Sequence, residues 1–134
     1  MKKKRVLIVD DESSSREIAV FDLKNIYDCD TAVDSFDAFE KICAAISDEA
    51  PYDVIAVDEL MPGMDGTALL RILSITEKYF IPQKVKQAKF VIISGVESDE
   101  HLVKMYKMLS NRCAFVKKSF DLGVLLNVVN SLVA

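Results

Sequence analysis

The chain has 134 residues, of which 51% are hydrophobic and 28% charged, so it carries enough apolar material for one folded domain and is not a disordered chain. Its formal net charge of −4 excludes the basic footprint of a direct nucleic-acid binder. No stretch approaches the roughly 18 apolar residues of a membrane span. We therefore expect residues 1–134 to form a single cytoplasmic domain that contacts no membrane.

The first predicted elements are a strand at Lys4–Val9 and a helix from Ser13 to about Tyr27. The pattern Ser14-x-x-Glu17 is a capping box and predicts the start of this helix. The positions at helical spacing, which we expect to form its apolar face, are Ile18, Ala19 or Phe21, Leu23 and Ile26. A more polar strand at Cys29–Val33 follows, as is typical of a sheet edge.

The alternation of strand and helix patterns continues to the end of the chain. A helix from Ser35 to about Asp48 has an apolar face formed by Phe36, Phe39, Ile42, Cys43 and Ile46. The later elements are a strand at Asp53–Val57, a helix from Thr67 to about Tyr79, a strand at Phe90–Ile93, a helix at Asp99–Leu109, a strand at Cys113–Val116 and a helix at Leu122–Val133. Five such units predict an α/β fold with a parallel sheet and helices on both faces. The polar segment Glu77–Lys89 predicts an extended connection, which we interpret as a surface insertion.

Carboxylates follow two of the predicted buried strands. Asp10 and Asp11 come directly after Val6–Val9, and Asp58 comes directly after Val54–Val57. In a doubly wound sheet of order 2-1-3-4-5 these two strands are neighbours, and their carboxyl ends meet where the helices leave for opposite faces. Three adjacent carboxylates need a compensating cation, and oxygen ligands favour Mg²⁺. The alternative is a set of helix-cap and turn aspartates that share no site.

Four motifs occur in one order along essentially the whole chain: Val9-Asp10-Asp11-Glu12, Asp58-x-x-Met61-Pro62-Gly63-Met64-Asp65-Gly66, Ser94 after a buried strand, and Phe115-Val116-Lys117-Lys118-Ser119-Phe120. This combination resembles the receiver domains of two-component response regulators, in their chemotaxis-regulator-like form. The resemblance implies a flavodoxin-like (βα)5 fold with a five-stranded parallel sheet of order 2-1-3-4-5. It also implies a phosphorylation-controlled interaction module, whose only catalysis is phosphoryl transfer to and from itself.

The resemblance further implies a role for each carboxylate. Asp58 would accept a phosphoryl group from a sensor histidine kinase or a histidine phosphotransfer protein. Asp11, Asp58 and the main-chain carbonyl of Leu60 would bind Mg²⁺, and Asp10 would hold the ion through water. Phosphoryl transfer of this kind needs alignment and charge neutralisation more than covalent machinery.

Ser94, Lys118 and Phe115 complete the set of residues that the resemblance assigns. Ser94 would hydrogen-bond a phosphoryl oxygen, Lys118 would pair with the phosphoryl group or with Asp58, and Phe115 would change rotamer on activation. Drawing the loops of Ser94 and Lys118 inward would shift the surface of the fourth helix, fifth strand and fifth helix, where we expect a downstream protein to bind. Formation of a homodimer stays open on this basis.

Three positions matter because they depart from the family pattern or lack polar groups. Ser119 stands where the family usually has proline, so we expect either a trans bond with a shifted Lys118 or a strained cis bond. Leu60 and Val96, which would flank the path of an attacking water, are apolar and cannot orient one. We therefore expect slow spontaneous loss of the phosphoryl group.

Two other classes of protein stay open on these residues. A Mg²⁺-dependent phosphatase of the haloacid-dehalogenase type would also use an aspartate nucleophile. That family has a second aspartate two residues after the nucleophile, however, where this chain has Leu60. A pseudo-receiver would bind partners without phosphate, although the retained acidic cluster and Lys118 argue against it. On the predicted fourth helix, Met105 and Met108 lie at helical spacing and form either a core edge or a partner-binding stripe.

Overall fold

The computed structural model describes residues 2–58, 66–79, 85, 87–94, 112–118 and 121–134, and the structural statements below concern these residues. In chain order the elements are β1 (Arg5–Val9), α1 (Ser13–Leu23), β2 (Asp28–Ala32), α2 (Ser35–Ser47), β3 (Val54–Asp58), α3 (Gly66–Tyr79), β4 (Lys89–Ser94), β5 (Cys113–Lys117) and α5 (Val124–Val133). The predicted fourth helix at Asp99–Leu109, with Met105 and Met108, lies outside the described residues.

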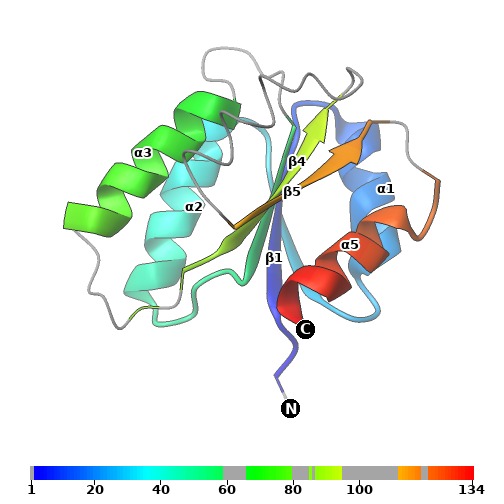
Figure 1. Ribbon diagram of the computed structural model, residues 1–134, viewed down its shortest axis with the longest axis horizontal. Coiled ribbons are helices and arrows are strands. Elements are labelled where there is room, and N and C mark those ends of the chain that lie inside the picture. The colour runs from blue at the N-terminus through cyan, green and yellow to red at the C-terminus, as the bar shows by residue number, and fades with distance from the viewer. Residues whose placement is uncertain (1, 59–65, 80–84, 86, 95–111, 119–120) are drawn as a thin grey trace.

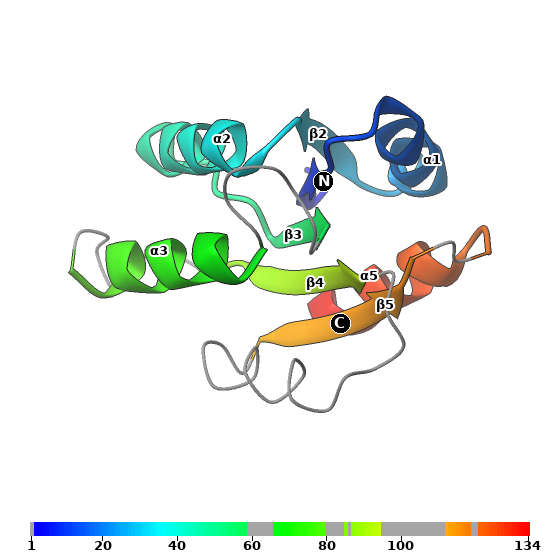
Figure 2. The same cartoon turned by 90° about the horizontal axis from the view of Figure 1, so that it is seen from above.

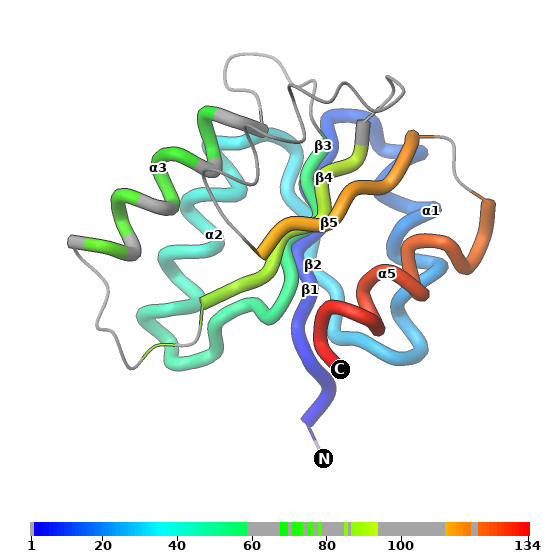
Figure 3. The backbone as a smooth tube through the Cα atoms, viewed as in Figure 1, coloured from blue at the N-terminus to red at the C-terminus, as the bar shows by residue number. Residues whose placement is uncertain are grey.

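The sheet confirms the predicted doubly wound order. All five strands run parallel in the order β2-β1-β3-β4-β5, with β1 and β3 side by side. Figure 1 shows the strands between the helices of the two sides. Helices α2 and α3 lie on one side of the sheet, whereas α1 and α5 lie on the other (Figure 2). The backbone tube shows the same division into three layers (Figure 3). The chain therefore has the α/β architecture in which ligands bind at the carboxyl edge of the central strands.

Side chains of the central strands alternate between two hydrophobic layers. The layer under α2 and α3 includes Leu7, Val9, Ile55, Val57, Phe90 and Ile92. The layer under α1 and α5 includes Val6, Ile8, Val54, Ala56, Val91 and Ile93. A strand buried on both faces reads as a continuous apolar run, which is why these strands were predictable. Because both faces are buried, the strand register is fixed, and the residues that end β1 and β3 are held at one edge.

Helix α1 starts where predicted, but its N-cap residue and its C-terminal end differ from the prediction. It begins at Ser13 with Glu12 as its N-cap, so the predicted capping box at Ser14 is wrong. It ends at Leu23 rather than near Tyr27, because the backbone N–H of Asp28 already donates to Lys4 in the neighbouring strand segment. The chain between these residues turns sharply to enter the sheet.

Several apolar side chains that we expected in the core are exposed. On α1, Ala19 and Leu23 are buried, but Ile18 and Phe21 are 56% and 60% exposed. Ile26 and Phe36, which we also predicted on apolar helix faces, are exposed as well, and so are Val33, Ile75, Leu122 and Val124. Helical spacing identifies a stripe of residues, but the sheet covers only the part of that stripe that points at it.

Helix α3 continues to Tyr79, so the predicted connection that begins at Glu77 starts later than expected. Residues 80–84 and 86 of that connection lie outside the described residues. Among the helices that the structure describes, none is both long and apolar enough to cross a membrane.

Candidate functional site

Three carboxylates meet at the carboxyl edge of the sheet. Asp58 is the last residue of β3, and Asp10 and Asp11 follow β1, whose Val9 is paired with Val57. One carboxylate oxygen from each aspartate lies within 4.8 Å of the others. Asp10 and Asp58 are buried, whereas Asp11 is exposed. The strand register thus brings together the acidic residues that the sequence singles out.

Backbone contacts hold the loop after β1 in place. The N–H of Asp10 donates to the carbonyl of Ala32 at 3.1 Å, which extends the pairing with β2 by one residue. The Asp10 carboxylate accepts a hydrogen bond from the N–H of Glu12 at 3.0 Å, and the Arg16 guanidinium donates to the Asp10 carbonyl at 2.7 Å. The acidic pair is therefore presented on an ordered turn that leads directly into α1.

Lys118 reaches the carboxylates from the end of β5. Its Nζ donates to Asp58 Oδ2 at 3.1 Å and lies 3.5 Å from Glu12 Oε1. The Asp58 side chain is 3% exposed, that of Lys118 28% and that of Glu12 58%. The ammonium group therefore lies between a buried carboxylate and one that is open to solvent. The sequence motifs indicate no role for Glu12, although this residue directly follows the acidic pair.

The pKa shifts reflect this concentration of negative charge. Burial raises the pKa of Asp10, and the nearby charges of Asp58 and Asp11 raise it further, against the opposing effects of the Glu12 N–H and Lys118. Burial alone would lower the pKa of Lys118, but its hydrogen bond to Asp58 and the surrounding carboxylates raise it overall. Lys118 consequently stays protonated, and one ammonium group faces several carboxylates. The three aspartates offer only oxygen ligands, which is the donor set that suits Mg²⁺.

The other predicted site residues are placed only in part. Ser94 is the last residue of β4, and its backbone pairs with Lys117 at the same edge of the sheet. Phe115 lies in the middle of β5, is partly buried and packs against the core layer under α2 and α3. The predictions for Leu60, Val96 and the peptide bond before Ser119 lie outside the described residues.

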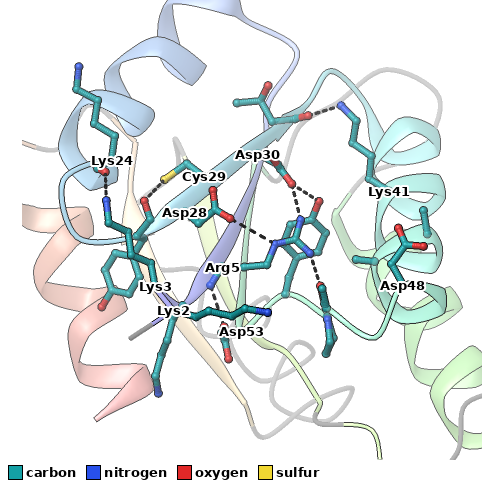
Figure 4. A pocket seen from close by; sticks show the side chains of 18 of the residues that line it. Lys2, Lys3, Arg5, Lys24, Asp28, Cys29, Asp30, Lys41, Asp48 and Asp53 are labelled. Carbon is teal, nitrogen blue, oxygen red and sulfur yellow. Dashed lines mark hydrogen bonds and ion pairs between the residues drawn. The ribbon is translucent and has the colours of Figure 1, made fainter.

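A separate hollow at the opposite, amino-terminal edge of the sheet contains a network of paired polar groups (Figure 4). Arg5 Nη2 lies 2.7 Å from Asp30 Oδ2, and the Tyr52 hydroxyl donates to the same oxygen at 2.7 Å. The Arg5 guanidinium also lies 4.4 Å from the centroid of the Tyr52 ring. Burial and the hydrogen bond to Asp30 raise the pKa of Tyr52 well above its usual range, so its hydroxyl stays a donor. These contacts tie β1 to β2 and to the segment before β3, which is a structural role.

Comparisons with known proteins agree with this fold. The family model described as the response regulator receiver domain matches residues 6–130. A chain of the CheX–CheY–BeF3–Mg²⁺ complex from Borrelia burgdorferi aligns with a TM-score of 0.82 and 24% identity, over 99% of this chain and 91% of that chain. The receiver domain of the histidine kinase CKI1 from Arabidopsis thaliana, complexed with Mg²⁺ and BeF3⁻, aligns with a TM-score of 0.79 and 25% identity, over 96% of this chain and 89% of that chain.

Two curated proteins match part of the sequence. Transcription factor SKN7 of Chaetomium thermophilum is 40% identical over 78 residues, which cover 54% of this chain and 10% of that protein. Hybrid signal transduction histidine kinase F of Dictyostelium discoideum is 33% identical over 75 residues, which cover 55% of this chain and 6% of that protein. The matched region therefore spans a tenth or less of either relative.

The fold and the acidic edge define the class as receiver domains of two-component signal transduction. The chain belongs to the response regulator receiver domain family, whose model matches it from residue 6 to residue 130.

Proposed function

We propose that this receiver domain accepts a phosphoryl group on Asp58 from a phosphohistidine of a histidine kinase or a phosphotransfer protein, in a Mg²⁺-dependent reaction. The observation that carries this proposal is a buried Asp58 carboxylate that lies beside the Lys118 ammonium and beside Asp10 and Asp11. A nucleophile, a fixed positive charge and a set of hard-cation ligands are the groups that phosphoryl transfer requires.

In the proposed reaction an Asp58 carboxylate oxygen attacks phosphorus, and the phosphorus–nitrogen bond of the donor breaks. The electron pair leaves with the imidazole nitrogen, and Asp58 becomes an acyl phosphate. Lys118 offsets the negative charge on the phosphoryl oxygens, and its raised pKa keeps it protonated for this role. Asp10, Asp11 and Asp58 would hold Mg²⁺, which when bound supplies further positive charge to those oxygens.

Two neighbours support the choice of ligand. The structures from Borrelia burgdorferi and Arabidopsis thaliana are complexes that contain BeF3 and Mg²⁺. We infer that Ser94, at the end of β4, contacts the phosphoryl group from the loop side, and that Phe115 responds to its presence. The resulting change in conformation would be recognised by a downstream protein that binds the surface that includes β5 and α5.

We also infer that the phosphodonor protein docks on α1. Ile18 and Phe21 are more than half exposed on this helix, and the helix begins directly after the acidic pair. Leu122 is 66% exposed, and it lies close to α1 because the next residue, Gly123, donates to the Asp22 carboxylate at 2.9 Å. An apolar patch on the helix that directly follows the acidic pair is suited to binding a helix that carries the phosphohistidine.

The test of the phosphoacceptor is direct. With Mg²⁺ and acetyl phosphate, the intact mass of the protein should increase by one phosphoryl group, and Asp58→Asn should abolish this increase. Binding of partners without any labelling of the wild-type protein would instead identify a pseudo-receiver. The docking surface is tested separately with Phe21→Ser, which should slow transfer from a phosphorylated protein donor but leave labelling by acetyl phosphate unchanged.

A further inference from the structure

One carboxylate oxygen of Glu12 faces the proposed reacting group. Glu12 occupies the N-cap position of α1, but its side chain caps no backbone N–H of the first turn, and its Oε2 accepts a hydrogen bond from the Ser15 hydroxyl at 3.5 Å. The other oxygen, Oε1, lies 3.5 Å from Lys118 Nζ. The proposed function does not use this contact.

The backbone holds Glu12 firmly at this position. Its N–H donates to the Asp10 carboxylate at 3.0 Å, and its carbonyl accepts the N–H of Arg16 at 3.1 Å. Lys118 Nζ lies 3.1 Å from Asp58 Oδ2 and 3.5 Å from Glu12 Oε1. The distance between these two carboxylate oxygens is therefore no greater than the sum of the two distances. Because the Glu12 side chain is 58% exposed and that of Asp58 only 3%, Glu12 lies on the solvent side of the site.

We propose that Glu12 is a specificity-determining residue that selects phosphodonors by the charge of their leaving group, favouring nitrogen-linked phosphoryl groups over acyl phosphates. This inference rests on the proposed function of Asp58. In phosphoryl transfer the attacking and leaving groups lie roughly in line. The leaving group of a donor that reacts with the buried Asp58 therefore departs on the solvent side, where Glu12 lies.

The two kinds of donor differ in the charge that they bring to this side. In phosphoramidate the phosphorus–nitrogen bond breaks, the electron pair stays on nitrogen, and a protonated nitrogen leaves as neutral ammonia. In acetyl phosphate the phosphorus–oxygen bond breaks, and the electron pair leaves with oxygen as acetate. In both reactions a carboxylate oxygen of Asp58 forms the new bond to phosphorus. The negative charge of Glu12 attracts the cationic nitrogen of the first donor and repels the developing carboxylate of the second.

The expected effect is modest but measurable. One unit charge at about 7 Å from another, in a medium close to water, changes a rate about threefold. Glu12→Gln keeps the shape of the side chain and removes its charge. This variant should raise kcat/KM for acetyl phosphate about threefold and should not raise that for phosphoramidate. The ratio of the two rates is the informative quantity, because a general disturbance of the site would alter both rates together.

The experiment measures initial rates of labelling by intact mass for both donors with Mg²⁺, at low and at high ionic strength. Glu17→Gln is the matched control, because it removes the same charge from an exposed position of the same helix. A shift of the donor ratio in Glu12→Gln that shrinks at high salt, with no shift in the control, supports the proposal. An unchanged ratio in Glu12→Gln, or an equal shift in Glu17→Gln, overturns it while leaving the role of Asp58 intact. Failure of both donors to label the wild-type protein overturns this proposal and the role of Asp58 together.

Discussion

Asp22 provides a sharp test of how the described fold is held together. Gly123 is the N-cap of α5 and has φ of +94°, so this helix has no capping side chain of its own. The Asp22 carboxylate on α1 supplies the cap, since it accepts the N–H groups of Gly123 at 2.9 Å and Leu126 at 3.2 Å. Asp22→Ala should therefore loosen the start of α5 without touching the sheet.

The size of the effect follows from the two hydrogen bonds and the charge. Loss of a capping side chain costs about 1 kcal/mol, and loss of a negative charge at a helix N-terminus costs a few tenths more. We expect Asp22→Ala to lower the free energy of unfolding by about 1.5 kcal/mol. With an unfolding entropy of roughly 2.1 cal/mol/K per residue, this loss corresponds to a decrease in Tm of about 5 °C. Asp22→Asn keeps an acceptor and should lose about half as much.

Urea unfolding followed by circular dichroism measures the change, and hydrogen exchange locates it. The amides of Gly123 and Leu126 should lose protection in Asp22→Ala, whereas those of the central strands should change only with global stability. Glu17→Ala, on the same helix, is the control and should change stability by less than about 0.5 kcal/mol. Equal stability of Asp22→Ala and the wild-type protein would show that the cap contributes nothing.

The remaining predictions concern charge, thiol reactivity and the lifetime of the phosphoryl group. Asp10→Asn should stabilise the metal-free protein at pH 7. The raised pKa of Asp10 means that the wild-type protein loses stability from this group as the pH rises from the pKa of the unfolded chain, near 4, through the pKa of the folded protein. Urea unfolding in EDTA from pH 4 to pH 8 checks this, and a destabilised variant would refute it. Burial and two neighbouring aspartates raise the pKa of Cys29 to about 11, so alkylation of a variant that keeps only this cysteine should be slow at pH 8 and should accelerate toward pH 11. Since Leu60 and Val96 are apolar, the phosphorylated protein should keep its phosphoryl group for minutes or longer, and loss within seconds would contradict that expectation.

The sheet and its acidic edge were predictable because local patterns encode them. A strand buried on both faces needs an unbroken apolar run, and Val6–Val9 and Val54–Val57 supply one each. The doubly wound order then places Asp10 and Asp58 together without knowledge of any side-chain contact. A short-range apolar pattern and the rule for the strand order were sufficient to predict that Asp10 and Asp58 lie together.

The contacts of Glu12 and Asp22 were not predictable in the same way. Lys118 lies more than 100 residues from Glu12, and Gly123 lies 101 residues from Asp22. Each pair forms because strands and helices far apart in the chain end near each other. The capping-box prediction failed for a different, local reason. Local spacing favoured Ser14 as the cap, whereas the Glu12 N–H donates to the Asp10 carboxylate and Glu12 occupies the N-cap position.

The negative charge of the acidic edge also explains why the strands that carry it must be well packed. Two buried carboxylates and a third beside them repel one another, and this repulsion opposes folding unless positive charge is held nearby. Lys118 provides one charge, and the N-terminus of α1, directly after Asp11 and Glu12, provides the positive end of a helix dipole. Neither neutralises three carboxylates, so the site keeps an excess of negative charge, which protonation of Asp10 or a bound cation would reduce. A core packed on both faces of β1 and β3 stabilises the fold against this repulsion, and the excess charge is the reason why we propose a divalent ion as the ligand of this edge.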